Sequence, residues 1–100
     1  MKLLTKELIK QIPPTYSQEE VEDPICWARL FTPWTSWTWY VIEFDPEENL
    51  CFGYVEGHEN ELGYFSIDEL EEIRGPIGLK IERDPHFTPK KLSEVKKENR

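Results

Sequence analysis

The segment of residues 37 to 44 constrains the fold of this chain more than any other. It reads Trp-Thr-Trp-Tyr-Val-Ile-Glu-Phe, and β-branched and aromatic side chains of this kind favour a strand. Because neighbouring side chains of a strand point in opposite directions, this one has two apolar faces: Trp37, Trp39 and Val41 on one, and Tyr40, Ile42 and Phe44 on the other. A strand that is apolar on both sides needs cover on both, or leaves one side for a partner. We expect the helices and the C-terminal segment to supply this cover.

Three further apolar runs accompany this strand, and short polar loops separate all four. The runs cover residues 25–31, 50–55 and 62–65. Short loops join antiparallel strands, whereas a parallel crossover needs a much longer connection. Residues 25–66 therefore predict an antiparallel meander, and residues 78–82 predict a further short strand at its edge.

Helical signals flank the predicted sheet. Residues 5–12 carry an apolar stripe that begins after a threonine N-cap and stops at two prolines. Residues 67–73 follow Ser66, which forms a capping box with Glu69. Residues 17–20, Ser-Gln-Glu-Glu, also have the pattern of a capping box and predict about one turn of helix.

The fold class that follows is α+β: an antiparallel meander sheet of four to five strands with two or three short helices. One hundred residues is the length of a single domain. The expected layout is an N-terminal helical segment (1–24), the meander (25–66), a helix (67–73) and a polar tail or short helix (88–100).

Cysteine usage and hydropathy indicate the compartment. Cys26 and Cys51 each lie in an apolar run rather than in a paired motif, so we expect two reduced, buried thiols. The N-terminus has no signal-peptide core, and no apolar segment approaches the roughly 20 residues of a membrane helix. The expectation is a soluble, cytoplasmic protein that does not act at a membrane.

Charge is distributed unevenly along the chain. The formal net charge is −8, yet residues 19–72 hold fifteen acidic residues and one base, while both ends are basic. Because phosphate binding needs a cationic face over most of the contact, this pattern disfavours direct nucleic-acid binding. Two arrangements stay open: the basic ends fold back over the acidic middle, or the acidic side chains form a continuous anionic surface.

Several strings of this sequence together resemble one protein family. They are Pro13-Pro14-Thr15-Tyr16-Ser17, Phe31-Thr32-Pro33, Trp37-Thr38-Trp39-Tyr40, Glu43-Phe44-Asp45, Phe52-Gly53-Tyr54-Val55, Glu61-Leu62-Gly63-Tyr64-Phe65-Ser66, Glu71-Glu72-Ile73-Arg74-Gly75-Pro76 and Leu79-Lys80-Ile81-Glu82-Arg83-Asp84. The family is an uncharacterised group of short bacterial proteins, a domain of unknown function often carried on plasmids, integrative elements and phages. The resemblance covers nearly the whole chain and implies a cytoplasmic cargo protein of a mobile element. It brings no activity, cofactor or active site.

Catalytic and metal-binding patterns are weak. His58, His86 and the two cysteines lack the spacing of known zinc motifs, and no phosphate-binding or nucleophile-elbow motif occurs. We therefore predict no catalytic residues, no metal site and no cofactor. A small hydrolase or metal-assisted enzyme remains an alternative, and it requires a histidine close to two carboxylates or to Cys51.

Partner binding is the class of function that the residues favour. A tryptophan in a loop, Trp34 beside Trp37, fits a binding hot spot, and the alternative is a ring folded back over the sheet edge. Carboxylates supply the rest of the candidate partner-binding set: Glu47, Glu48, Asp68, Glu69, Glu71 and Glu72, with Glu19, Glu20, Glu22 and Asp23 extending the same charge.

The working hypothesis is a non-enzymatic cytoplasmic protein-interaction domain of a mobile genetic element. It binds a protein partner, such as a nucleic-acid-processing enzyme, through the acidic surface and the aromatic loop. The alternative is an acidic nucleic-acid mimic that inhibits a host defence nuclease. The sequence does not indicate an oligomeric state.

Overall fold

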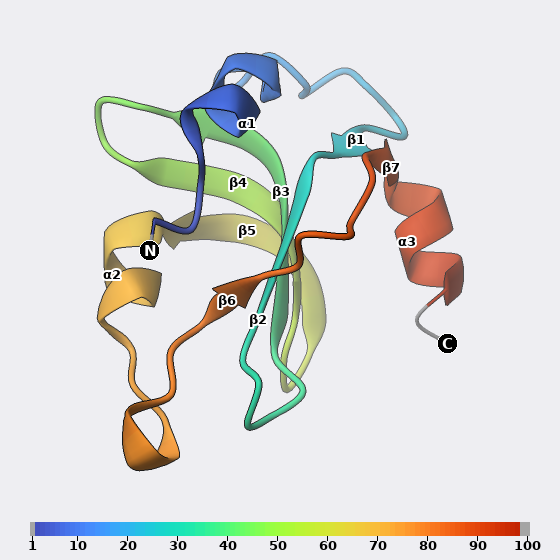
Figure 1. Ribbon diagram of the computed structural model, residues 1–100. Coiled ribbons are helices and arrows are strands. Elements are labelled where there is room, and N and C mark those ends of the chain that lie inside the picture. Colours follow the sequence, from blue (N-terminus) through green and yellow to red (C-terminus); the bar gives the residue numbers. More distant parts are fainter. Residues whose placement is uncertain (1, 99–100) are drawn as a thin grey trace.

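A five-stranded antiparallel sheet forms the centre of the protein. The computed structural model describes residues 2–98, and Figure 1 shows the arrangement of the elements. The large sheet has the strand order β5-β4-β3-β2-β6, and β1 pairs with β7 in a small second sheet. The strands are β1 (Ile25–Cys26), β2 (Ala28–Phe31), β3 (Thr38–Asp45), β4 (Leu50–Glu56), β5 (Asn60–Ser66), β6 (Glu82–Arg83) and β7 (Lys90–Lys91). The prediction of an α+β fold built on an antiparallel meander is confirmed.

Three short helices accompany the sheet: α1 (Lys6–Gln11), α2 (Ile67–Glu72) and α3 (Leu92–Glu98). The Thr5 side chain caps α1 by accepting from the Leu8 amide, and Ser66 caps α2 by accepting from the Glu69 amide. Both N-caps therefore lie where the sequence placed them. None of the helices within residues 2–98 is long and apolar enough to cross a membrane.

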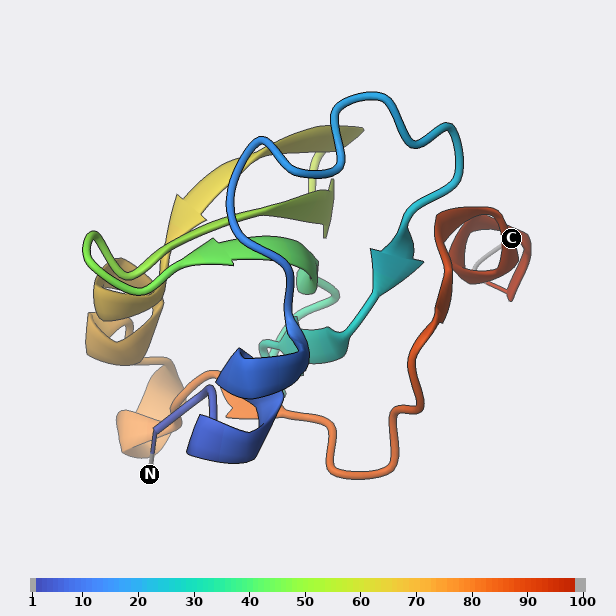
Figure 2. The same ribbon diagram turned by 90° about the horizontal axis from the view of Figure 1, so that it is seen from above.

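Each face of the large sheet has its own core. The first face carries Trp39 and Val41, and α1, α2 and the chain before α1 cover it. The second face carries Tyr40 and Ile42, and α3 covers part of it through Leu92 and Val95. Figure 2 shows α1 and α2 on the side of the sheet away from α3. The expectation that helices and the C-terminal segment cover β3 on both sides agrees with this packing.

The prediction for Phe44 was wrong. Phe44 packs with Trp39 and Val41 in the first core rather than with Tyr40 and Ile42. The register of β3 against β4 shifts between Val41 and Glu43, because Val41 pairs with Gly53 whereas Glu43 pairs with Phe52. One extra residue in a strand reverses the side on which every later side chain emerges. Strict alternation therefore fails at this bulge.

Residues 17–20 do not form the expected helical turn and lie in hydrogen-bonded turns instead. The Ser17 amide donates to the Pro14 carbonyl at 3.3 Å and the Val21 amide to the Gln18 carbonyl at 3.1 Å, so the chain forms two separate turns here. The Tyr16 and Gln18 amides donate to the Glu43 carboxylate rather than to a helix cap.

The C-terminal part is more ordered than a polar tail. The expected strand at 78–82 is shorter and lies at Glu82–Arg83, because a 3₁₀ turn (η1, Pro76–Gly78) occupies the chain before it. The short helix expected around residues 92–97 is present as α3. The Asp23 carboxylate accepts from both the amide and the hydroxyl of Ser93, which fixes α3 to the loop before β1. The last two positions of the expected tail, 99–100, lie outside the described residues.

Candidate functional site

A groove opens on the second face of the large sheet, between β5, the loop before β1 and the start of α3. Its volume is about 430 Å³, within the range of roughly 300–1,000 Å³ that ligand pockets usually have. The residues that line it come from the loop before β1, from β3, β4 and β5, and from α3: Gln18, Glu19, Glu22, Pro24, Glu43, Phe52, Leu62, Tyr64 and Leu92. We call this feature the Tyr64 groove.

Exposed apolar side chains concentrate around the Tyr64 groove. Leu62 and Tyr64 line it and are 49% and 50% exposed, and Tyr16 and Val21 in the adjoining loop are 65% and 44% exposed. The Tyr64 ring packs against Phe52 with ring centroids 5.0 Å apart, and against Tyr16 at 6.4 Å. Single exposed apolar residues are ordinary, but a group of them beside a groove is typical of an interaction site.

Carboxylates give the Tyr64 groove a negative character. Glu19 and Glu22 are exposed at its border, whereas Glu43 is only 2% exposed. No lysine or arginine of residues 2–98 lines the groove. Partial burial, followed by a hydrogen bond with Tyr16 and the charges of Glu43 and Glu19, raises the pKa of Tyr64.

The buried carboxylate of Glu43 is held by the loop that forms one wall of the groove. One oxygen accepts from the Tyr16 amide at 2.9 Å and the other from the Gln18 amide at 2.8 Å. Neither of the two ion pairs described within residues 2–98 involves Glu43. The charge is therefore compensated by backbone dipoles alone, which is an uncommon state for a buried carboxylate.

A second acidic region lies where the β3–β4 turn meets the start of α2. The Asn49 side chain donates to Asp68 at 2.7 Å, and the Ile67 amide donates to the Asn49 carbonyl at 3.0 Å. These bonds join the β3–β4 turn to the start of α2. They bring together carboxylates that the sequence analysis selected, which we call the acidic end: Glu47, Glu48, Asp68, Glu69, Glu71 and Glu72.

The carboxylates of the acidic end differ in exposure and in hydrogen bonding. Glu47, Glu48, Asp68, Glu69 and Glu72 are exposed, but Glu71 accepts from the Leu3 amide at 3.0 Å. The C-terminal lysines belong to β7 and α3, and Figures 1 and 2 show α3 on the other side of the molecule from α2. The N-terminal Lys2 lies nearer, across a small cavity of about 210 Å³ that Asp68 and Glu71 also line. The lysines of β7 and α3 therefore do not cover this region, although Arg74 donates to the Glu71 carbonyl at 2.6 Å.

The two tryptophans selected from the sequence pack against the body of the protein. Trp34 is half-buried against the first core, and its ring lies so close to Gly75 that an added Cβ would come within 2.3 Å. Trp34 therefore does not project into solvent, and its ring folds back onto the protein. Trp37 stacks on Trp39 with ring centroids 5.9 Å apart and meets the edge of His58 at 5.5 Å. Both rings thus offer less free surface than Leu62 and Tyr64.

The comparison with known protein families is decisive for classification. A family model described as protein of unknown function (DUF2958) matches residues 3–99. The chain belongs to the DUF2958 family. No curated protein and no solved structure matches it significantly. The resemblance to an uncharacterised family is thereby confirmed, and the family description assigns no activity to this DUF2958 domain.

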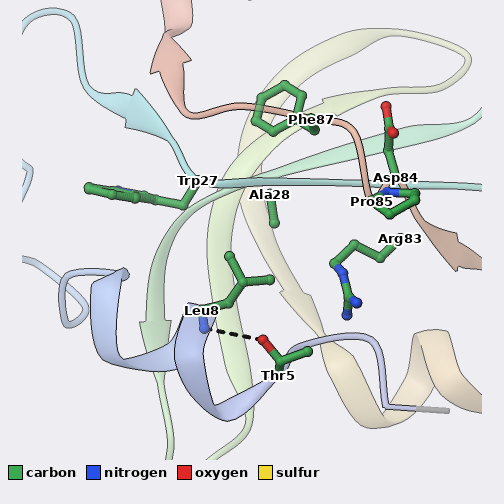
Figure 3. Close-up of a pocket in the computed structure, with 8 residues that line it drawn as sticks. All are labelled: Thr5, Leu8, Trp27, Ala28, Arg83, Asp84, Pro85 and Phe87. Atoms are coloured by element: carbon green, nitrogen blue, oxygen red, sulfur yellow. Dashed lines mark hydrogen bonds between the residues drawn. The ribbon is translucent and has the colours of Figure 1, made fainter.

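A further cavity, of about 240 Å³, lies between α1 and the segment after β6 (Figure 3). The polar side chains that line this cavity already form hydrogen bonds or ion pairs within the protein. The Thr5 hydroxyl accepts from Leu8, and an Arg83 nitrogen donates to the Leu3 carbonyl at 2.7 Å. Asp84 forms an ion pair with Arg29 and accepts from the His86 amide. In this DUF2958 domain the cavity supports packing rather than a set of reacting groups.

The histidines and cysteines of this DUF2958 domain lie apart. Within residues 2–98, no three His, Cys, Asp or Glu side chains gather closely enough to hold a metal ion. His58 and His86 are exposed, while Cys26 and Cys51 are fully buried free thiols. Burial, followed by the charge of Asp23, raises the pKa of Cys26 to about 12, and burial also raises the pKa of Cys51. Neither thiol therefore has the lowered pKa of a nucleophile.

Sequence reasoning did not select the central residues of the Tyr64 groove. Leu62 and Tyr64 share one side of β5, and the sequence predicted only that they belong to a short strand. Glu43 was the better signal, because a single carboxylate inside an apolar strand requires a partner. Its partner loop lies 25 to 27 positions earlier in the chain, which no local pattern reveals.

Proposed function

We propose that this DUF2958 domain is a non-enzymatic protein-interaction domain that binds a basic, partly apolar segment of a protein partner. The observation that carries the proposal is the Tyr64 groove, where exposed apolar side chains adjoin three carboxylates without a lysine or arginine in its lining. An apolar floor supplies binding energy, and a charged border supplies selectivity and orientation.

The acidic end has a supporting part in this proposal. Its exposed carboxylates and the net charge of −8 give the protein a strong negative field. Such a field speeds the encounter with a cationic partner, and salt weakens the effect. Trp34 and Trp37 pack against the first core, so they have no part in this proposal.

The setting of the proposed function follows from the family resemblance rather than from the geometry. We place the domain in the cytoplasm and among the cargo proteins of mobile genetic elements, with a nucleic-acid-processing enzyme as the kind of partner. Such enzymes present basic surfaces, which complement the charge of this chain.

Affinity capture at two salt concentrations tests the proposal. The wild type is compared with Leu62→Ala/Tyr64→Ala, and with Ile77→Ala, which removes an apolar side chain that is 98% exposed outside the groove. We expect the wild type and Ile77→Ala to retain the same partner at low salt, and the double variant to lose most of it. Equal capture by all three proteins would contradict the proposal.

A second candidate function rests on the acidic end. Carboxylates from two separate elements are held at one end of the molecule by the bond between Asn49 and Asp68. Such an arrangement suits a mimic of the phosphate backbone that occupies the basic groove of a nuclease. If this candidate holds, nucleic acid competes with the protein for the nuclease, and Asp68→Lys/Glu72→Lys abolishes inhibition. Retained inhibition by that variant would exclude it.

A further inference from the structure

The strand beside the Tyr64 groove is an edge strand. β5 ends the strand order β5-β4-β3-β2-β6, and no strand of the described chain lies on its outer side. Figure 2 shows β5 at the outside of the sheet. One side of its backbone therefore presents N–H and C=O groups without a strand partner, and such an edge is a template for an added strand.

The side chains of β5 connect this open edge to the groove. Leu62 pairs with Tyr54 and Tyr64 pairs with Phe52, so both emerge on the second face and toward the groove. Phe65 emerges on the first face and packs into the first core. A strand added beside β5 would place alternate side chains about 4.5–5.5 Å from Leu62 and Tyr64 on the same face. The groove and the edge therefore suit one extended segment.

The charges around the groove select the chemistry of that segment. Glu43 is buried without a cation beside it, and Glu19 and Glu22 stand at the border. A lysine or arginine has an apolar stem that can lie along Phe52 and Tyr64 and a cationic head that can meet the carboxylates.

A second copy of this chain is a poorer occupant. Residues 60–66 contain one acidic residue, Glu61, and no lysine or arginine, so self-pairing through β5 brings no cation to the groove. Each copy also carries a net charge of −8, and like charges oppose association.

We propose that the partner adds an extended segment to β5 and places a lysine or arginine side chain in the Tyr64 groove. This inference rests on the proposed function and specifies how the partner is bound. Backbone hydrogen bonds to the edge give affinity, and the groove gives the preference for a basic side chain.

The test starts from a selection of displayed random 12-residue peptides on the wild-type protein. The expected sequences carry a lysine or arginine with apolar residues two positions away. The selected peptide is then synthesised in two N-methylated forms, one methylated at odd and one at even positions. Since a β-strand uses every second N–H toward one neighbour, one form should lose about tenfold or more in affinity, and the other should change little. Amide shifts should change along residues 60–66.

The outcomes separate this inference from the proposed function. A peptide whose binding needs Tyr64, but which tolerates both methylation patterns or lacks a basic residue, overturns strand addition and leaves the proposed function standing. A selection that yields no peptide dependent on Tyr64 contradicts both. Concentration-dependent dimerisation that Tyr64→Lys abolishes would assign the edge to a second copy and overturn the inference.

Discussion

The carboxylate of Glu43 and the amide of Tyr16 are joined by a 2.9 Å hydrogen bond between positions 27 apart in sequence. The bulge after Val41 turns Glu43 away from the first core and toward the second face, where the loop passes. The same carboxylate binds Gln18 through its other oxygen. One side chain of an interior strand thus shapes a wall of the Tyr64 groove.

Replacing Glu43 should loosen that wall. Glu43→Ala removes two charge-assisted hydrogen bonds, each of which contributes about 1.5–3 kcal/mol, while it also removes a buried charge. We expect the free energy of unfolding, measured in urea, to fall by about 3 kcal/mol. Hydrogen exchange at the Tyr16 and Gln18 amides should accelerate. Glu48→Ala, in an exposed turn, is the matched control and should change neither quantity. Unchanged exchange at both amides in Glu43→Ala would refute this role.

The contact between Gly75 and Trp34 gives a second prediction. A Cβ at Gly75 would lie 2.3 Å from the Trp34 ring, whereas a Cβ at Gly63 meets no atom within 4 Å. Gly75→Ala should lower the free energy of unfolding by about 1–3 kcal/mol and shift the Trp34 indole resonance. Gly63→Ala should stay within about 0.5 kcal/mol of the wild type. Equal stability of the two variants would show that Trp34 does not pack as described.

The hydrogen bonds between Asp23 and Ser93, which fix α3 to the loop before β1, should be lost at low pH. The hydroxyl and the amide of Ser93, followed by the charges of Lys91 and Lys96, lower the pKa of Asp23 from its ordinary value of 3.8. A lowered pKa stabilises the folded state above pH 3.8, and that contribution is lost as the pH falls through the folded value. The protection factor of the Ser93 amide should therefore fall below pH 3.8 in the wild type, and Asp23→Asn should remove that dependence. A pH profile that is the same in both proteins would contradict the anchor.

The buried thiols should destabilise the protein in alkali. The pKa of Cys26 rises from 9.0 to about 12 on folding, so the unfolded chain loses its proton first. The contribution of this thiol to stability is complete below pH 9 and is lost as the pH rises from 9 toward 12. In that window Cys26→Ala should show a slope of unfolding free energy against pH that is shallower by about 1.4 kcal/mol per unit. Parallel slopes for the two proteins would show that Cys26 ionises freely in the fold.

The sequence was most informative where structure depends on local chemistry. The N-caps Thr5 and Ser66, the proline stop after α1 and the short loops of the meander each act within a few residues. Those signals are sufficient to predict the α+β class and the meander from β2 to β5, but not the place of β6 beside β2 or the small β1–β7 sheet. The direction of Phe44 could not be predicted, because the bulge that reverses it depends on the pairing of β3 with β4.

The candidate site was harder to predict for the same physical reason. The Tyr64 groove combines a loop before β1, the outer strand β5 and the start of α3, and each of these alone resembles ordinary surface or core. The acidic end was partly visible, since its carboxylates cluster in two short segments. These two segments are held together by the hydrogen bond between Asn49 and Asp68, which lie 19 positions apart in the sequence.

Site-specific photocrosslinking in cells that express the protein tests the central claim most directly. A benzophenone amino acid is placed at the position of Leu62, inside the Tyr64 groove, or at the position of Ile77, which lies outside the groove and is more exposed, 98% against 49%. The account predicts a crosslink to a protein partner from position 62, which Glu19→Lys/Glu22→Lys abolishes, and none from position 77. Crosslinks of equal yield from both positions, or from position 77 alone, would contradict it.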